Sequence, residues 1–425
     1  TNQGENSMAS VTGGQLVAKA LLEKQVAYIF TLSGGHITPI YQYLENTEIT
    51  LFDTRHEQAA VFMAEAWGKL TRGPGVAMVT AGPGFTNALT GVASAHFSNT
   101  PLVLIAGCVG LDHKERLDLQ DMPQAAVIGP MVKAAYVCQK TERIAEYVDM
   151  AFRTATTGRP GPVYLEFPVD LLNATIDEDK VRRPVTLVNS KPVDLAGVDH
   201  TLDLIAAAEK PVVIAGSGVW QAGAEAELIS FIDASGIPVF TTLSGRGTIS
   251  DQHPLCFESA LAIRPGGAFA AYLETDLIIV LGTRISLFYF FGDVFNPAAK
   301  MVQVDIEPEE LGRNRKIDLP IVSDLKAFLE LCNQRVRERH LSETFAQQFA
   351  TWIETLRAAD ADGKAPHTPA WESDNTPIHP MRLAREVDRF MNRDDDIVVA
   401  DGGDTTTWMG MTRTMPVAGH YLDYG

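Results

Sequence analysis

The sequence predicts an α/β fold built from doubly wound parallel sheets. Short apolar runs end in glycine or polar turns, and each is followed by a segment whose apolar residues recur at helical spacing. Runs such as GVAMV and PLVLIAG are apolar throughout, which is typical of strands covered on both faces in a parallel sheet. The length of 425 residues and the hydrophobic content of 46% indicate a globular chain of two or three domains.

The first domain is predicted over residues 8–176, where helix and strand signals alternate. Helices are expected at 13–26, 37–46, 57–73 and 87–99, and strands at 27–35, 49–55, 75–85 and 101–107. The apolar face of the 57–73 helix is expected to contain Ala60, Met63, Ala64, Trp67 and Leu70. The domain is predicted to end shortly after the segment GRPGPVYLEFPVDLLN.

Two further units follow, separated by segments without periodicity. Residues 177–194 are charged, contain two prolines and are predicted to be a linker. A second alternating pattern predicts a Rossmann-like middle domain over 195–340. The sequence then becomes polar and irregularly helical, and we interpret residues 341–376 as a second linker. Residues 377–425 contain one helix signal and one strand that enters a glycine turn, and we interpret them as the start of a third, incomplete domain.

Composition and charge exclude several classes of function. The chain has 35 basic and 53 acidic residues, a net charge of -18, and no basic block, so we expect no nucleic-acid partner. No apolar run approaches the roughly 20 residues that cross a bilayer, so we expect no membrane span. The four cysteines are widely spaced without a CxxC pair, which favours unreactive thiols in the cytoplasm over disulfides or a zinc site.

Glu57, at the end of the run TLFDTRHE, is the strongest candidate for chemistry. An apolar strand stops at this carboxylate and passes directly into a helical segment, which predicts an acid at the carboxyl end of a strand. Open α/β sheets bind their ligands at that edge. The alternative is a structural ion pair with Arg55. His36 and Gln120 are expected near the same edge, although surface or packing roles remain open for both.

Glycine turns mark two further candidate sites. Gly82, Pro83 and Gly84 lie between a strand and a helix, where backbone N–H groups can face a ligand; the alternative is an ordinary connecting turn. In the middle domain, Gly216-Ser217-Gly218 with Gly223 resembles part of a dinucleotide fingerprint but departs from the GxGxxG spacing, and Asp305 closes a later strand. The alternative for this second group is plain sheet packing.

Several segments together resemble the thiamine-diphosphate-dependent enzymes of the acetolactate synthase type. They are TGGQLVAKALLEK, FTLSGGHI, DTRHEQAA, VTAGPGFTNALTGVASA, RPGPVYLEFPVDLL, KMVQVDIEPEELG and VVADGGDTTTW, and the resemblance extends over nearly the whole chain. The first 170 residues are most similar to benzaldehyde lyase and to the branch of 2-hydroxyacyl-CoA lyase and oxalyl-CoA decarboxylase. The resemblance implies pyrimidine-binding (8–176), middle (195–340) and diphosphate-binding (377–425, truncated) domains.

The resemblance also implies roles for single residues. Glu57 matches the glutamate that activates the aminopyrimidine of the cofactor, and His36 and Gln120 match positions that hydrogen-bond the substrate oxygen. The implied cofactor-binding positions are Gly34, Gly35, Thr80, Gly82, Pro83, Gly84, Asn87, Gly402, Gly403, Asp404, Thr405 and Gly425. Mg²⁺ is implied as well, but the chain contains no Gly-Asp-Gly run, so no metal ligand is assigned and the ligands are expected beyond Gly425.

The implied activity is that of a lyase or carboligase acting on a small carbonyl or acyl-CoA substrate. It would cleave or form 2-hydroxy ketones or 2-hydroxyacyl-CoA through an ylide and an enamine. His36 favours this reading, because acetolactate synthases differ at that position. The alternatives are condensation of 2-keto acids, as in acetolactate synthase, and a non-catalytic homologue.

The resemblance leaves a nucleotide in the middle domain open. ADP, CoA or FAD would bind near Gly216, Gly218 and Arg284. Relatives of this type build each active site between two subunits, so a homo-oligomer, a dimer or tetramer, is expected.

Overall fold

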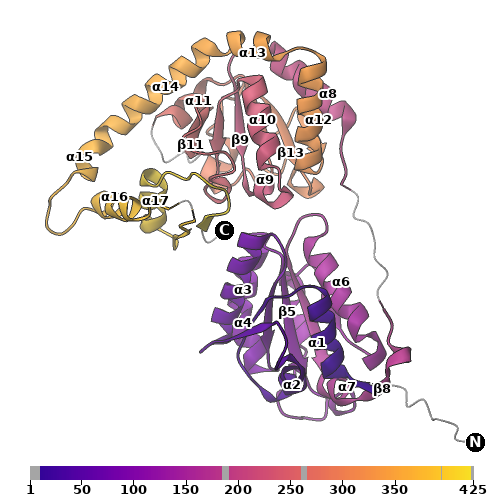
Figure 1. Cartoon of the computed structure of the whole chain (residues 1–425). Helices are drawn as coiled ribbons and strands as arrows, with labels where there is room; N and C mark the ends of the chain where they lie inside the picture. The colour runs from indigo at the N-terminus through magenta and orange to yellow at the C-terminus, as the bar shows by residue number, and fades with distance from the viewer. Residues whose placement is uncertain (1–9, 184–190, 260–265, 394, 423–425) are drawn as a thin grey trace, which may run out of the picture. The chain divides into compact units, whose positions relative to one another are not determined.

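The computed structural model describes residues 10–183, 191–259, 266–393 and 395–422 (Figure 1). Residue 8, at the start of the first predicted domain, residues 184–190 of the first predicted linker, and Gly425 lie outside these ranges. The chain divides into two compact units, the first reaching Asn189 and the second extending over Ser190–Tyr424. Each unit is described by itself.

The first unit contains a six-stranded parallel sheet in the order β3-β2-β4-β5-β7-β6. Its strands are β2 (Tyr28–Thr31), β3 (Thr50–Asp53), β4 (Gly75–Val79), β5 (Leu102–Cys108), β6 (Ala135–Val137) and β7 (Pro162–Pro168). β4, β5 and β7 are buried along their whole length, whereas the edge strand β3 is exposed. The predicted parallel sheet is confirmed here, and the short, half-buried β6 is an addition that periodicity did not indicate.

Helices cover both faces of this sheet (Figure 1). One face carries α1 (Gly13–Glu23), α2 (Thr38–Leu44), α6 (Ile144–Thr156) and α7 (Val169–Asn173), and the other carries α3 (Glu57–Thr71), α4 (Pro83–Phe97) and α5 (Gln124–Ile128). On each face, a separate apolar core lies between the sheet and its helices. Outside the sheet, β1 (Ser10–Thr12) pairs antiparallel with β8 (Thr175–Asp177).

The buried face of α3 differs from the prediction at two residues, Met63 and Val61. Met63, predicted on the apolar face, is 45% exposed, and Val61 is buried beside Ala60 and Ala64. The helix lies very close to β4, because a Cβ added to Gly75 of that strand would lie 1.8 Å from the carbonyl oxygen of Ala64. This close packing of the helix on the sheet fixes the position of its first residue, Glu57.

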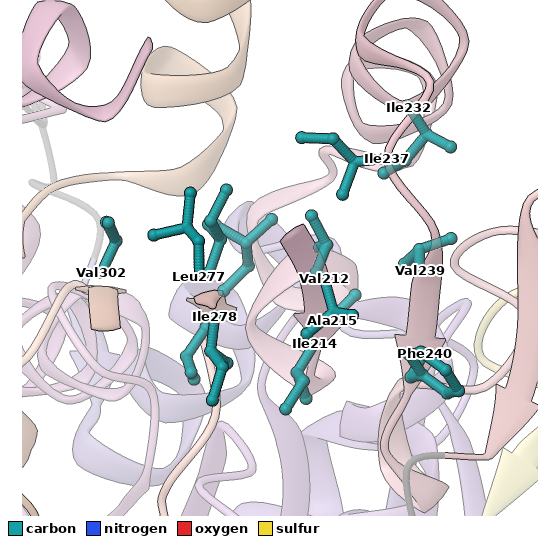
Figure 2. Packing of buried hydrophobic residues seen from close by; sticks show 14 of the residues in the cluster. Val212, Ile214, Ala215, Ile232, Ile237, Val239, Phe240, Leu277, Ile278 and Val302 are labelled. Atoms are coloured by element: carbon teal, nitrogen blue, oxygen red, sulfur yellow. The ribbon is translucent and has the colours of Figure 1, made fainter. Parts of the chain in front are cut away.

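The second unit contains another six-stranded parallel sheet, in the order β11-β10-β9-β12-β13-β14. Its strands are β9 (Pro211–Ala215), β10 (Val239–Thr241), β11 (Cys256–Ser259), β12 (Leu277–Leu281), β13 (Lys300–Asp305) and β14 (Leu319–Val322). Figure 2 shows Ile232 and Ile237, at the end of α10 (Glu225–Ser235) and just after it, facing Val212 and Val239 of the sheet. Four further helices packed around this sheet are α8 (Leu195–Ala207), α9 (Ser217–Ala222), α11 (Gly267–Glu274) and α12 (Leu325–Glu338).

Residues 341–376, predicted as a linker, are largely helical. They form α13 (Ser342–Gln348), α14 (Ala350–Lys364) and α15 (Thr368–Trp371). Their buried apolar side chains belong to the core of the second sheet, namely Phe345, Phe349, Trp352, Ile353 and Leu356. These positions follow helical spacing, as the irregular helical pattern of the sequence indicated, but the many polar residues between them gave no sign that the segment packs into a core.

The end of the chain forms a small subassembly within the second unit. It consists of α16 (Pro380–Phe390), β15 (Val398–Val399), α17 (Asp404–Thr412) and β16 (Tyr421–Leu422), with β15 and β16 paired in parallel. The buried Arg246, in the loop after β10, donates to the carbonyl oxygens of Gly410 and Arg413 and pairs with the buried Asp251. Asp251 also accepts a bond of 2.7 Å from the backbone N–H of Met415. This ion pair therefore joins the middle sheet to the last helix.

All four cysteines are free thiols, and burial raises the pKa of Cys138 to about 11 and of Cys256 to about 12. Such thiols are poor nucleophiles at neutral pH. Within the described ranges, no helix combines the length and apolar character that a bilayer span requires.

Candidate functional site

Glu57 is the first residue of α3 and lies where the chain leaves β3, at the carboxyl edge of the first sheet. Its side chain is 7% exposed, and Asn87 Nδ2 donates a hydrogen bond of 2.9 Å to Glu57 Oε2. Arg55, the alternative partner, is exposed and pairs instead with Asp53 at 2.9 Å. The sequence-predicted placement of the acid is thus observed, and the suggested ion pair with Arg55 is not.

Thr80, directly after β4, brings three of the predicted residues together. A Cβ on Gly34 would lie 2.3 Å from Thr80 Cβ, and one on Gly84 would lie 2.7 Å from Thr80 Cγ2. The Gly84 Cβ would also approach Glu57 Oε1 to 3.3 Å, so this carboxylate oxygen lies beside the glycine turn. Only glycine leaves these gaps open, which is why the turns after β2 and β4 can meet around one threonine.

His36 and Gln120 reach the same edge of the sheet from two different loops. His36 Nδ1 lies 3.3 Å from Thr80 Oγ1, and the backbone of His36 packs on Gly107 so closely that a Cβ there would lie 2.5 Å from His36 Cβ. Gln120 lies against Gly82, whose added Cβ would come within 2.8 Å of Gln120 Cβ. The structure therefore gathers the predicted acid, imidazole and amide around Thr80 and the Gly82–Gly84 turn.

The remaining predicted positions of the first unit are more open. Pro83 is the first residue of α4 and is exposed, and Gly35 has no neighbouring atom within 4 Å of an added Cβ. Asn87 is largely exposed although its amide bonds Glu57. These residues therefore border the cluster on its solvent side.

The pKa of His36 is lowered from its ordinary value of 6.5 because the ring is partly removed from water, an effect that Asp118 opposes only in part. The imidazole is therefore neutral at pH 7, with one nitrogen able to donate and the other to accept. A neutral ring suits hydrogen bonding to a carbonyl or hydroxyl group.

This lowered pKa has a consequence for stability. The folded state disfavours the proton, so the contribution of His36 to stability is present above pH 6.5 and is lost as the pH falls through the lowered folded-state pKa. We expect the melting temperature of the wild type to fall more between pH 7.5 and pH 5 than that of His36→Asn. Thermal unfolding of both proteins at the two pH values measures this difference, and equal acid sensitivity would contradict it.

The predicted residues near the end of the chain form a separate turn in the second unit. Gly402 and Gly403 precede α17, which begins at Asp404, and Gly403 adopts a φ of 80°. Asp401 Oδ1 accepts the backbone N–H of Gly402 at 2.8 Å, and Asp401 to Thr405 are exposed. The N-terminus of α17 presents backbone N–H groups that suit an anion, whereas the N–H of Gly402 is already bonded to Asp401.

The glycines of the middle domain are accounted for by packing. A Cβ on Gly216 would lie 2.4 Å from the carbonyl oxygen of Gly282, and one on Gly218 would lie 2.7 Å from Gly282 Cα. The turn after β9 thus lies directly on the turn after β12, so no ligand is needed to explain these residues. Asp305 ends β13, and its Oδ1 accepts the N–H of Glu307 at 2.9 Å. A nucleotide in this domain stays a prediction.

Two buried residues beside the cluster were missed from the sequence. Gln124 is 1% exposed and accepts the backbone N–H of Gly82 at 2.8 Å, and Glu166 of β7 is 3% exposed and accepts from Gln124 at 3.2 Å. A glutamate inside the apolar run PVYLEFP was the available signal, because a charged residue is rarely buried without partners. No comparable signal marked Gln124 in its polar loop.

In comparisons with known proteins, segments of both units match domains of the same enzymes. The N-terminal TPP-binding domain of thiamine pyrophosphate enzymes matches residues 11–127, and the central domain of the same enzymes matches residues 198–331. The chain is 32% identical over 418 residues to a probable acetolactate synthase large subunit of Methanococcus aeolicus, covering 94% of this chain and 68% of the relative.

Two further relatives carry similar names. The acetolactate synthase large subunit of Lactococcus lactis is 34% identical over 409 residues, covering 94% of this chain and 68% of the relative. The large subunit from Mycobacterium tuberculosis is 30% identical over 414 residues, covering 97% and 72%. These names correspond to the alternative that the sequence left open, the acetolactate synthase type, rather than to the benzaldehyde lyase branch.

Proposed function

The chain belongs to the thiamine pyrophosphate enzymes, and we propose that it uses thiamine diphosphate to condense 2-keto acids, as an acetolactate synthase does. The observation that carries this proposal is the buried Glu57 carboxylate at the sheet edge, inside the segment matched by the TPP-binding domain. The names of the relatives support 2-keto acids as the substrate class.

Each unit, taken by itself, contains polar groups whose chemistry suits a part of this cofactor. In the first unit Glu57 offers a carboxyl group to a ring nitrogen. In the second unit the N-terminus of α17 offers backbone N–H groups that suit a diphosphate. When bound, thiamine diphosphate supplies a centre that stabilises a carbanion. Among the described residues no cluster of three metal-binding side chains occurs, so the Mg²⁺ ligands stay a prediction and no step is assigned to the metal.

In this proposal Glu57 exchanges a proton with the aminopyrimidine ring. Its Oε2 is bonded by Asn87, which fixes the plane of the carboxyl group, and its Oε1 lies beside the Gly84 turn. A carboxyl group that is buried and oriented in this way can hold or release one proton without rearranging its surroundings. Asn87 is therefore a positioning residue for Glu57.

His36 and Gln120 act on the substrate oxygen in the same proposal. Both side chains can donate a hydrogen bond, and an oxygen that gains negative charge is stabilised by such preorganised donors. The neutral state of His36 allows it to donate from one ring nitrogen while the other lies near Thr80 Oγ1.

A second candidate function uses the same residues to cleave a carbon–carbon bond instead of forming one. His36 is a half-buried, neutral imidazole at the site edge, and the resemblance to benzaldehyde lyase implies that a histidine at this position favours cleavage of a 2-hydroxy ketone or 2-hydroxyacyl-CoA. A homo-oligomer stays a prediction for both candidates.

A substrate panel distinguishes the candidates. The protein, supplied with thiamine diphosphate and Mg²⁺, is given pyruvate, benzoin and a 2-hydroxyacyl-CoA in parallel, and each product is quantified. We expect pyruvate to be consumed with formation of acetolactate. Cleavage of benzoin or of the acyl-CoA without pyruvate turnover would support the lyase instead. Failure to bind thiamine diphosphate together with no turnover of the three substrates would contradict both candidates.

A further inference from the structure

The amide of Gln124 connects the carboxyl ends of three neighbouring strands. Its Oε1 accepts the N–H of Gly82 at 2.8 Å, in the turn after β4. Its Nε2 lies 3.1 Å from the carbonyl oxygen of Gly107 on β5 and within 3.2 Å of the Tyr164 hydroxyl and Glu166 Oε2 on β7. The backbone N–H of Gly82 can only donate and the carbonyl oxygen of Gly107 can only accept. These two contacts therefore fix the orientation of the Gln124 amide group.

Tyr164 and Glu166, the partners of Gln124 on β7, are themselves buried and hydrogen-bonded. The Tyr164 hydroxyl donates to Glu166 Oε2 at 2.8 Å, and Glu166 Oε1 lies 3.6 Å from Lys114 Nζ. Burial, followed by the carboxylate of Glu166, raises the pKa of Tyr164, so its hydroxyl keeps the proton that it donates. Every polar group around Gln124 thus has a partner, and a fully satisfied buried network of this kind is rigid.

Each of the two backbone groups that Gln124 holds supports one of the proposed substrate-facing residues. Gly82 is in contact with Gln120, and Gly107 is in contact with the backbone of His36. Gln120 itself has a φ of 67°, and Glu115 and Leu117 in the same loop have φ values of 62° and 60°. Such conformations are uncommon for residues with side chains and persist where the surrounding contacts hold them.

We infer that Gln124 is a positioning residue that fixes the spacing between His36 and Gln120 by holding Gly107 and Gly82 with one buried amide. This inference rests on the proposed function for its catalytic meaning. Gln124 touches neither reacting group directly, so it acts through the two glycines. A displacement of about 1 Å at a substrate-binding group can lower a rate about a hundredfold, which is the size of effect expected when the amide is removed.

The test compares Gln124→Met with Gln303→Met. Methionine has a similar length but cannot form the hydrogen bonds. Gln303 is an equally buried glutamine, 1% exposed, that accepts the N–H of Gly312 at 3.1 Å and donates to the carbonyl oxygen of Glu310 at 3.3 Å in the second unit. The control therefore removes the same kind of side chain from a place without proposed catalytic residues.

Two measurements are made on each variant. Hydrogen exchange of the cofactor-free protein, followed by mass spectrometry on peptides covering residues 80–86, is expected to be at least about tenfold faster at Gly82 in Gln124→Met and unchanged in Gln303→Met. With thiamine diphosphate and Mg²⁺, kcat/KM is expected to fall about a hundredfold in Gln124→Met. The melting temperature should fall by similar amounts in both variants.

Several results would overturn the inference. Wild-type exchange at Gly82 in Gln124→Met would mean that the amide does not hold the turn, and faster exchange with wild-type kcat/KM would mean that the turn does not position the substrate groups. If Gln124→Met does not fold, Gln124→Glu keeps the acceptor for Gly82 but not the donor for Gly107, and wild-type kcat/KM in that variant would contradict the inference. If the wild type neither binds the cofactor nor turns over a substrate, the positioning role falls with the proposed function, while the exchange data still decide separately whether Gln124 holds the turn.

Discussion

Replacing Glu57 with glutamine is expected to lower turnover at saturating thiamine diphosphate by about a hundredfold or more. Glutamine keeps the length of the side chain and an oxygen that can accept from Asn87, so the local packing survives. The amide cannot take up and release a proton, however, and proton exchange is the role that we propose for this residue. Steady-state kinetics with the substrate that the wild type consumes measures the loss.

The same helix offers a matched control. Glu65 lies two turns further along α3, is 4% exposed, and is bonded by Ser98 Oγ at 2.8 Å and paired with Lys69 Nζ at 3.0 Å. Glu65→Gln therefore changes another buried glutamate without touching the cluster around Thr80, and its turnover should equal that of the wild type. Equal losses in the two variants, or normal turnover in Glu57→Gln, would refute the role of Glu57.

Replacing Arg246 with methionine is expected to destabilise the second unit by about 3–5 kcal/mol. The side chains of Arg246 and Asp251 are completely buried, and the guanidinium also donates to the last carbonyl groups of α17. Methionine leaves the Asp251 carboxylate buried without its cation and leaves two backbone oxygens without a donor. The loss of stability is large because the carboxylate and the two carbonyl oxygens stay buried and form no hydrogen bonds with water instead.

Urea unfolding followed by tryptophan fluorescence measures this change, because four of the five tryptophans lie in the second unit and Trp67 alone lies in the first. Arg339→Met is the control. Arg339 pairs with Asp199 at 2.7 Å and Asp203 at 2.9 Å on the surface of the same unit, and an exposed pair contributes about 0–1 kcal/mol. If the two variants unfold at the same urea concentration, the buried ion pair does not hold the end of the chain.

The sequence predicted the location of the candidate site because strand ends in a parallel sheet share one edge. Glu57 and Thr80 follow β3 and β4, and the loop with His36 follows β2, so recognising each strand was enough to bring these residues together. The glycines at 34 and 84 were recognisable as turns, but their contacts with Thr80 depend on backbone distances that spacing does not reveal.

Contacts between elements distant in the sequence could not be predicted. Gln124 bonds Gly82 across 42 residues, and Arg246 bonds Arg413 across 167. The middle-domain glycines show that one short pattern can have two explanations. Their spacing resembled part of a nucleotide fingerprint, whereas close packing of two turns already requires residues without a Cβ at Gly216 and Gly218.

We propose that the Glu57 carboxyl group hydrogen-bonds the pyrimidine ring nitrogen of thiamine diphosphate. Titration of the wild type and of Glu57→Leu, in the presence of Mg²⁺, with the cofactor and with an analogue in which that nitrogen is replaced by carbon, tests this bond. We expect the wild type to bind the cofactor at least about tenfold more tightly than the analogue. The Glu57→Leu variant should bind the two equally. A wild type without this preference, or a variant that keeps it, would contradict the claim.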